Sequence, residues 1–314
     1  MTNELDMVVF GPIPSRRLGR SLGINNIPFK NCTYSCVYCQ VGATNSLSIK
    51  RKEFYKPEQI YKEVDIKINE LNNSNEKIDY ITFVPDGEPT LDINLGIIIK
   101  KIKVFGSKIA VITNSSLITD KYVQNELMEA DLVSLKIDTV YSDVWHRINR
   151  PHGLINLEDI KEGILEFASV YKGILYTETM LVKGINDNFC SLYETGLFID
   201  QIHPLKAYIL IPTRPPAEKI NPPESEQIKS IKKIFSAINQ NFEFIDYDEG
   251  TNFTFDNNFE KELLSIISVH PMSKEAVKSF LEKADVGWDM IDKLIKNNVI
   301  KKIQYKGDSF FKIK

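Results

Sequence analysis

The chain has 314 residues, of which 43% are hydrophobic, and its net charge is −3 at pH 7. This length allows one large domain and a small one, and the near-neutral charge excludes a global attraction to nucleic acid or membranes. The chain has no uncharged apolar run of the roughly 18 residues that a membrane-spanning helix needs, and its N-terminus lacks the apolar core of a signal peptide. We therefore expect a cytoplasmic protein without a membrane partner.

Short apolar segments alternate with longer amphipathic ones as far as residue 240. This alternation is typical of repeated β–α units around a parallel sheet. We expect strands at residues 21–25, 80–84, 109–113, 132–137, 174–182 and 207–211. We expect helices at residues 57–71, 91–104, 120–128, 157–170, 189–201 and 224–240. The sequence therefore predicts an α/β fold in which residues 1–250 form a partial, open (β/α)6 barrel of the TIM type.

The C-terminal residues have a different pattern. The polar residues 251–258 predict a linker before a small domain at residues 259–314. The elements expected in that domain are three short helices at 259–269, 273–283 and 288–297, and a hairpin with strands at 299–305 and 309–314. Three helices followed by a hairpin resemble a winged helix-turn-helix domain.

Three of the four cysteines lie close together, at Cys32, Cys36 and Cys39. A [4Fe–4S] cluster needs four ligands, usually thiolates, so three cysteines leave one iron open to another ligand. A structural zinc site would need a second pair of cysteines or histidines, and the four histidines of this chain are scattered. Cys190 opens a predicted helix far from the other three, and we expect it to be a small buried side chain.

The spacing CxxxCxxC, with Tyr38 before the last cysteine, resembles the cysteine motif of the radical S-adenosylmethionine superfamily. Residues 11–23, 181–187 and 211–216 are similar to a branch of that superfamily related to the wyosine-forming tRNA enzymes. The resemblance extends to about Tyr247. The wyosine-forming enzymes carry further cysteines for a second cluster, which this chain lacks, so we expect the general chemistry of the superfamily rather than that specific activity.

The resemblance implies that Cys32, Cys36 and Cys39 hold a [4Fe–4S] cluster and that the chain binds S-adenosylmethionine (SAM). The reduced cluster would cleave SAM to methionine and a 5′-deoxyadenosyl radical, which would take a hydrogen atom from a substrate. The protein would hold the cofactor against the reacting bond and exclude water. Since no flavin or ferredoxin domain is fused to the chain, the expected electron donor is a separate flavodoxin or ferredoxin.

The resemblance also implies cofactor-binding residues. Tyr38 occupies the position at which the superfamily places an aromatic ring against the adenine of SAM. Asp86, Gly87, Glu88 and Pro89 resemble the GGEP motif that receives the methionine ammonium, with Asp86 in place of the first glycine. Glycine lets the backbone approach closely, and a carboxylate accepts a cation. The alternative is that this Gly-Pro loop is only a turn.

Three more residues correspond to superfamily positions near the cofactor. Asn114 follows the third predicted strand and could contact SAM or cap a helix. Glu178 and Asn186 match positions near the ribose and the methionine carboxylate, and the alternative for Asn186 is a turn residue. Arg214, after the last predicted barrel strand, is available to an anionic group.

Polar residues alternate with apolar ones in the fourth predicted strand. Ser134, Lys136 and Asp138 share one face, and we expect the apolar residues between them to face the helices. Three polar side chains inside a barrel need partners or a ligand. We expect Ser134 to contact SAM, and Lys136 and Asp138 to act on the substrate or the ribose. The alternative is an internal Lys136–Asp138 pair with a structural role.

The first candidate substrate is RNA, and tRNA in particular. The reasons are the resemblance, the cluster of Arg16, Arg17 and Arg20, and a basic C-terminal domain. The lysines of that domain are Lys293, Lys296, Lys301, Lys302, Lys306, Lys312 and Lys314. The second hypothesis is an enzyme that modifies or activates a protein or peptide, with the C-terminal domain as docking module. The third is a non-catalytic redox sensor that binds DNA through the winged helix.

Overall fold

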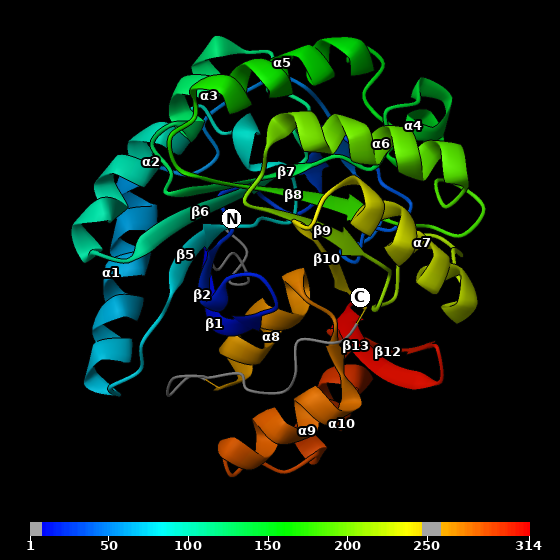
Figure 1. The fold of residues 1–314 in the computed structure, drawn as a ribbon. Helices are drawn as coiled ribbons and strands as arrows, with labels where there is room; N and C mark the ends of the chain where they lie inside the picture. The colour runs from blue at the N-terminus through cyan, green and yellow to red at the C-terminus, as the bar shows by residue number, and fades with distance from the viewer. Residues whose placement is uncertain (1–7, 247–258) are drawn as a thin grey trace.

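The computed structural model describes residues 8–246 and 259–314 (Figure 1). Its main sheet has eight strands in the order β1-β2-β5-β6-β7-β8-β9-β10. The strands are β1 (Val9–Ser15), β2 (Gly19–Ile24), β5 (Tyr80–Phe83), β6 (Lys108–Thr113), β7 (Leu132–Lys136), β8 (Ile174–Met180), β9 (Lys206–Leu210) and β10 (Phe242–Ile245). In this sheet β2 and the strands from β5 to β10 are parallel, and β1 pairs with β2 in antiparallel orientation. The sheet has two edges, so the predicted open barrel is confirmed.

Helices cover the outer face of this curved sheet (Figure 1). They are α1 (Pro57–Asn73), α2 (Leu95–Ile102), α3 (Lys121–Leu127), α4 (Ser142–Ile148), α5 (Leu157–Val170), α6 (Phe189–Ile202) and α7 (Ser225–Ile238). All six predicted β–α units are present, although single 3-10 turns precede and follow α2. Within residues 8–246, the sequence did not predict α4, the two edge strands β1 and β10, or the short parallel pair β3 (Asn31–Cys32) and β4 (Ser46–Leu47). Strand β1 contains Pro12 and Pro14, which obscure a strand pattern.

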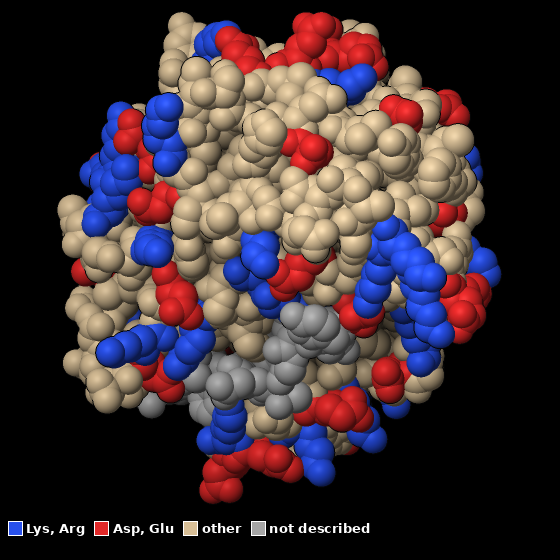
Figure 2. Space-filling model, in the orientation of Figure 1, with Lys and Arg blue, Asp and Glu red and all other residues tan. Residues whose placement is uncertain are grey.

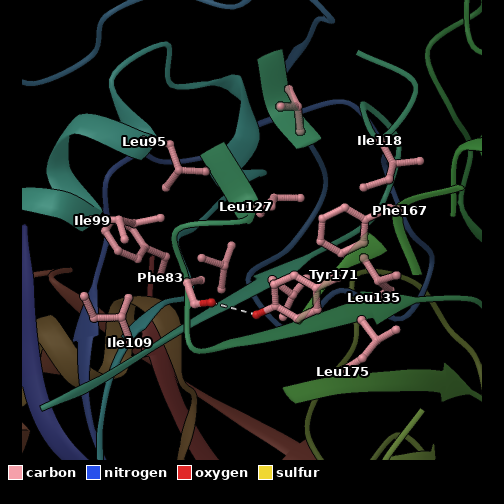
Figure 3. Packing of buried hydrophobic residues seen from close by; sticks show 14 of the residues in the cluster. Phe83, Leu95, Ile99, Ile109, Ile118, Leu127, Leu135, Phe167, Tyr171 and Leu175 are labelled. Carbon is pink, nitrogen blue, oxygen red and sulfur yellow. Dashed lines mark hydrogen bonds between the residues drawn. The ribbon is translucent and has the colours of Figure 1, made fainter. Parts of the chain in front are cut away.

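An apolar core fills the space between the sheet and the outer helices (Figure 3). Leu95 and Ile99 of α2 and Phe167 of α5 pack in one cluster with Phe83 of β5 and Leu135 of β7. Each of these side chains is fully buried, which contributes roughly 1.5–3 kcal/mol per residue. The apolar face of β7 therefore meets the helices as predicted. Its polar face is left to the inside of the barrel.

The C-terminal residues form a compact unit that we call the C-terminal module, residues 259–314. Its elements are α8 (Phe259–Val269), β11 (Met272–Ser273), α9 (Lys274–Lys283), α10 (Asp289–Lys296), β12 (Ile300–Tyr305) and β13 (Asp308–Ile313). The three predicted helices and the hairpin are present, and β11 extends the hairpin to a sheet of order β11-β13-β12. The predicted linker 251–258 lies outside the described residues.

The C-terminal module fills the open side of the barrel. Helix α8 contacts β1 and β13, and Figure 1 shows it between them. Phe10 and Ile13 of β1 belong to the same apolar cluster as the helices of the module. At the other side, the Tyr305 hydroxyl and Lys306 Nζ donate to the Pro212 carbonyl at 3.2 and 2.9 Å. Within residues 8–246 and 259–314, no helix has the length and apolar character needed to cross a membrane.

A buried ion pair attaches α8 to the barrel. Glu262 Oε2 accepts a hydrogen bond from Lys67 Nζ of α1 at 2.9 Å, and its Oε1 accepts one from the Gly11 backbone N–H, also at 2.9 Å. Glu262 is 1% exposed and Lys67 is 6% exposed. Because both charges are removed from water, each depends on the other. The module is therefore held in one position on the barrel.

Candidate active site

A cavity of about 300 Å³ lies inside the barrel at the carboxyl ends of the strands. Reactive groups collect at this edge of a parallel sheet because the loops that follow the strands converge there. The polar residues in the wall include Cys32, Cys36, Tyr38, Cys39, Glu88, Asn114, Lys136, Glu178 and Arg214. The C-terminal module completes the wall with Val269, the last residue of α8, and His270.

Each sulfur of the three clustered cysteines receives a hydrogen bond from a nitrogen. The pairs are Asn114 Nδ2 to Cys32 Sγ at 3.5 Å, Asn149 Nδ2 to Cys36 Sγ at 3.5 Å, and Lys30 Nζ to Cys39 Sγ at 3.2 Å. Hydrogen bonds to ligating sulfurs orient them and stabilise negative charge on them. The donor set therefore suits three thiolates that face one cavity.

The same sulfurs fit a cubane cluster better than a single ion. In the part of the chain that the structure describes, no three His, Cys, Asp or Glu side chains are grouped to hold one metal ion. A [4Fe–4S] cluster bonds each thiolate to a different iron, so its ligands need not converge on one point. Three sulfurs on one wall, with an open cavity in front of them, leave room for the cluster and for a ligand to the fourth iron.

The cysteine loop is fixed from two sides. Thr33, after the first cysteine, accepts a hydrogen bond from Asn114 Nδ2 at 2.7 Å, and its hydroxyl is 2.6 Å from the Ser116 hydroxyl. Val37 N–H donates to the carbonyl of Ile148, the last residue of α4, at 3.0 Å. Both contacts join the loop to segments distant in sequence. The cysteines are therefore held in place by the loops after β6 and α4.

The protein surroundings of Cys32 and Cys36 disfavour their thiolate forms. Burial raises the pKa of Cys36 to about 12, with a further contribution from the charge of Asp138. Burial likewise raises the pKa of Cys32 far above its ordinary value, with a further contribution from Glu88. These two cysteines would hold iron as thiolates and would release their protons on binding it, because only the thiolate is a ligand. A cationic centre is what this wall requires to carry thiolates.

Glycine is the only residue type that fits at position 87. A Cβ at this position would lie 1.8 Å from the Asn31 carbonyl oxygen, which is backbone and cannot move aside as a side chain can. The Glu88 N–H donates to the same carbonyl at 3.2 Å. The loop after β5 therefore packs directly against the residue before Cys32. This close approach is the physical reason for glycine in the Gly-Glu-Pro sequence.

The Glu88 carboxylate lies in the cavity wall and is 1% exposed. Its Oε1 accepts hydrogen bonds from the hydroxyls of Thr90 at 2.7 Å and Thr113 at 2.6 Å, and its Oε2 accepts one from the Asn114 backbone N–H at 2.7 Å. Burial raises the pKa of Glu88, and these hydrogen bonds oppose that rise. The carboxylate is thus held rigidly beside the cysteines.

The other two residues of this loop lie differently. The Asp86 side chain points to Asn25, whose Nδ2 donates to Asp86 Oδ2 at 3.0 Å, while the Asp86 N–H donates back to Asn25 Oδ1 at 3.0 Å. Burial raises the pKa of Asp86 to about 6. Pro89 begins the 3-10 turn that Glu88 caps. Among the described residues, the cavity wall includes Gly87 and Glu88 but neither Asp86 nor Pro89.

Glu178 of β8 is the second carboxylate of the cavity wall. It accepts hydrogen bonds from Arg17 Nη1 at 2.6 Å and from the Ser134 hydroxyl at 2.7 Å. Burial alone would raise the pKa of Glu178, but the charges of Arg17, Lys136 and Arg16 together with the Ser134 hydrogen bond outweigh burial and lower it. Glu178 is therefore ionised, and Ser134 acts on the site through it.

Asp138 is the centre of a hydrogen-bond network behind the cavity. Its carboxylate accepts hydrogen bonds from the Tyr38 hydroxyl, from Asn149 Nδ2 at 2.6 Å, and from the Met180 backbone N–H at 2.7 Å. Lys136 Nζ lies 3.8 Å from Asp138 Oδ1 and 5.0 Å from the centre of the Tyr38 ring. Tyr38 and Lys136 reach the cavity, whereas Asp138 is outside the described part of its wall.

Asn186 fastens the loop after β8. Its Oδ1 accepts a hydrogen bond from the Val182 N–H at 2.8 Å, and its Nδ2 donates to the carbonyls of Asp138 and Met180, both at 2.9 Å. All of these partners are backbone groups. The geometry matches the turn interpretation of Asn186, and the side chain is not among the described residues that line the cavity.

The structure corrects the expected burial of Cys190 and separates the three arginines that the sequence analysis grouped together. Cys190 is exposed rather than buried: it lies in the first turn of α6 and is not among the buried residues of that helix. The cluster Arg16, Arg17 and Arg20 is divided: the first two arginines line the cavity, whereas Arg20 pairs with Glu76 near the surface.

Four residues at or beside the site were missed from the sequence: Lys30, Gln40, Asn149 and His270. Gln40 follows Cys39, and its Nε2 donates to the Val269 carbonyl at 3.0 Å. Its Oε1 accepts a hydrogen bond from Arg214 Nη1 at 3.4 Å. The only signal available for Lys30 and Gln40 was their place beside the cysteines. His270 carried none, since it is far from every other site residue in the sequence.

Comparison with known proteins decides the family. The Radical SAM superfamily matches residues 26–195, more than half of the chain. The chain belongs to the radical SAM superfamily. A UPF0026 protein of Methanocaldococcus jannaschii is 47% identical to it over 307 residues, which are 97% of this chain and 95% of that protein. The expected superfamily is thus confirmed, and this radical SAM enzyme uses a [4Fe–4S] cluster and SAM as its cofactors.

Solved structures resemble this radical SAM protein in fold. A radical SAM methyltransferase from Sphaerobacter thermophilus has a TM-score of 0.55 at 13% identity, over 72% of this chain and 66% of that one. TYW1 with a lysine-pyruvate adduct bound has a TM-score of 0.50 at 17% identity, over 69% of this chain and 73% of that one. At these identities the likeness concerns the fold alone. It agrees with the open barrel described above.

Proposed function

We propose that this enzyme cleaves SAM reductively at a [4Fe–4S] cluster held by Cys32, Cys36 and Cys39, and that it removes a hydrogen atom from a substrate in the cavity. When bound and reduced, the cluster with SAM supplies the 5′-deoxyadenosyl radical. One observation carries this proposal: the three sulfurs, each with a nitrogen donor, face the same cavity as Glu88.

The other polar residues of the cavity wall would bind and orient SAM. Glu88, fixed by hydrogen bonds, offers its carboxylate to the methionine ammonium of SAM. We propose that Tyr38, held by Asp138 and Asn149, lies against the adenine, and that Glu178 accepts a hydrogen bond from the ribose hydroxyls. Asp138 would then orient Tyr38 rather than contact the substrate. Apolar residues in the wall, such as Phe10 and Ile13, exclude water from the reacting bond.

Lys136 is our candidate for contact with the substrate. It lines the cavity, and its partners Tyr38 and Asp138 leave its ammonium partly available, since the distance of 3.8 Å to Asp138 Oδ1 is longer than a good hydrogen bond. An ammonium at this place can bind an anionic or carbonyl oxygen of a substrate. Asn114 supports Cys32 and Thr33, so we propose a positioning role for it.

The direct test is anaerobic incubation of the reconstituted, dithionite-reduced protein with SAM, with 5′-deoxyadenosine measured by chromatography. Cys36→Ala removes a sulfur of the cavity wall and should abolish the product. Cys190→Ala is the matched control, because that cysteine is exposed on α6 and should have no effect. Product that persists in Cys36→Ala, or that disappears equally in both variants, would contradict the proposal.

For the substrate we keep RNA as the proposal to test first. Lys293, Lys296, Lys301 and Lys302 are exposed on the C-terminal module. Lys306 and Lys312 are used in contacts with the barrel. On the face shown in Figure 2, basic and acidic side chains are interspersed. If RNA is bound, tRNA affinity should fall steeply with salt and depend on Lys293, Lys296, Lys301 and Lys302. A protein that binds no tRNA at low salt would direct the search to a protein or peptide substrate.

We also propose the division of the chain and its electron donor. The C-terminal module has its own sheet and helices in the order typical of a winged helix-turn-helix domain, which supports its treatment as a separate domain joined by the linker 251–258. We propose a flavodoxin or ferredoxin as the reductant. Stimulation of SAM cleavage by a purified flavodoxin system, compared with dithionite, tests this partner.

A further inference from the structure

Lys30 is a buried lysine beside the cysteine loop. It is 2% exposed, and its Nζ donates to Cys39 Sγ at 3.2 Å. Its backbone N–H donates to the Asp86 carbonyl at 3.1 Å, and its own carbonyl accepts hydrogen bonds from the N–H groups of Asn45 at 3.2 Å and Ser46 at 3.0 Å. The residue is thus fixed between the loop after β5 and the end of the cysteine loop.

The three sulfurs do not receive equivalent donors. Cys32 and Cys36 receive neutral amide N–H groups, at 3.5 Å each, whereas Cys39 receives the ammonium of Lys30 at the shorter distance of 3.2 Å. A hydrogen bond from a charged donor is roughly twice as strong as a neutral one. In a buried site the charge is also screened less by water. The strongest fixed stabilisation of negative charge therefore lies at Cys39.

We propose that Lys30 sets the reduction potential of the cluster through Cys39. One-electron reduction adds a negative charge to the cluster and its thiolates, and a fixed cation close to one sulfur stabilises the reduced form more than the oxidised form. Cluster potentials depend on net charge and on hydrogen bonds to the sulfurs. Lys30 contacts neither SAM nor the substrate in this account, so it is a positioning residue. The inference rests on the proposed function in one respect, that Cys39 is a ligand.

The test uses the reconstituted holoprotein without SAM. The variants are Lys30→Met, which removes the charge and the donor, and Lys30→Gln, which keeps an N–H donor without the charge. Lys50→Met, an exposed lysine further along the same segment, is the control. Iron and sulfide content are matched first, and the midpoint potential is then measured by a redox titration followed by electron paramagnetic resonance of the reduced cluster.

We expect the midpoint of Lys30→Met to be more negative by at least a tenfold change in the equilibrium constant for reduction, which is 59 mV for one electron. Lys30→Gln should lie between Lys30→Met and the wild type, and Lys50→Met should match the wild type. A merely structural role for Lys30 would change cluster content or protein stability without moving the potential.

Three results would overturn parts of this account separately. If Lys30→Met has the cluster content and the midpoint of the wild type, the inference about Lys30 is wrong while the proposed function stands. If Lys30→Met takes up no cluster, Lys30→Gln decides, and an unchanged midpoint in that variant would also refute the inference. If Cys39→Ala keeps the same cluster signal and SAM cleavage, the ligand assignment in the proposed function fails instead.

Discussion

The buried carboxyl of Asp86 provides a quantitative prediction. Its pKa is about 6 in the folded protein, compared with an ordinary value of 3.8, because burial disfavours the charged form. The folded chain therefore binds this proton more tightly than the unfolded chain, and the free energy of unfolding falls as the pH rises through this interval. A difference of about two pKa units corresponds to about 3 kcal/mol in total. Asp86→Asn removes the ionisable group and should therefore abolish this decrease in the free energy of unfolding.

The assay compares two free energies of unfolding at two pH values. Urea denaturation of the cluster-free protein, at about pH 4.5 and about pH 7, gives the pH dependence for the wild type and for Asp86→Asn. Between these values we expect the wild type to lose about 2 kcal/mol relative to the variant. The asparagine can still accept the hydrogen bond from Asn25, and any constant difference between the two proteins cancels. Other buried carboxyls, such as Asp92 and Glu126, are present in both proteins and cancel too.

Equal pH dependence in the wild type and Asp86→Asn would refute the reasoning, because it would mean that Asp86 ionises in the folded protein as easily as in water. Asp159→Asn, on the exposed side of α5, is the control for a change of one carboxyl at the surface and should leave the pH dependence unchanged.

Two further predictions concern packing and charge. Gly87→Ala should destabilise the protein by about 1–3 kcal/mol and lower SAM cleavage, because the new Cβ would lie 1.8 Å from the Asn31 carbonyl oxygen. The matched control is Gly153→Ala, whose Cβ would have no neighbour within 4 Å. Equal thermal stability of the two variants would contradict the argument. Lys67→Met should cost about 3–5 kcal/mol because it removes the cation that pairs with the buried Glu262 carboxylate. The double variant with Glu262→Gln should recover part of that loss in thermal unfolding.

The barrel could be predicted from the sequence because its strands and helices are long and strongly patterned. In β7, alternation assigned Val133 and Leu135 to the helices and Ser134 and Lys136 to the inside, and the core confirms the apolar half of this prediction. The edge strands were missed for physical reasons. Strand β1 is interrupted by prolines, and β10 has only four residues, so neither has a clear period.

Motif reasoning reached the cysteines and Glu88 because their spacing is set by the chemistry of the cluster and cofactor. It could not reach the contacts between distant segments. Asn149 approaches Cys36 only because α4 ends against the cysteine loop, and His270 enters the cavity wall only because α8 closes the open side of the barrel. The sequence also does not reveal in which direction a polar side chain points. Asp86 and Asn186 bond to neighbouring loops, which no spacing rule distinguishes from contact with a cofactor.

The attachment of α8 to β1 has a consequence for the order in which the protein assembles. The hydrogen bond from Gly11 to Glu262 joins residues that are 251 positions apart, and Phe10 and Ile13 share their apolar cluster with helices near the other end of the chain. The apolar face of β1 can be covered only after almost the whole chain has been synthesised. Contacts of such long range form late in folding and leave apolar surface open to aggregation meanwhile. Iron and sulfide that arrive before α8 docks would meet an incomplete cavity, open to oxygen and water.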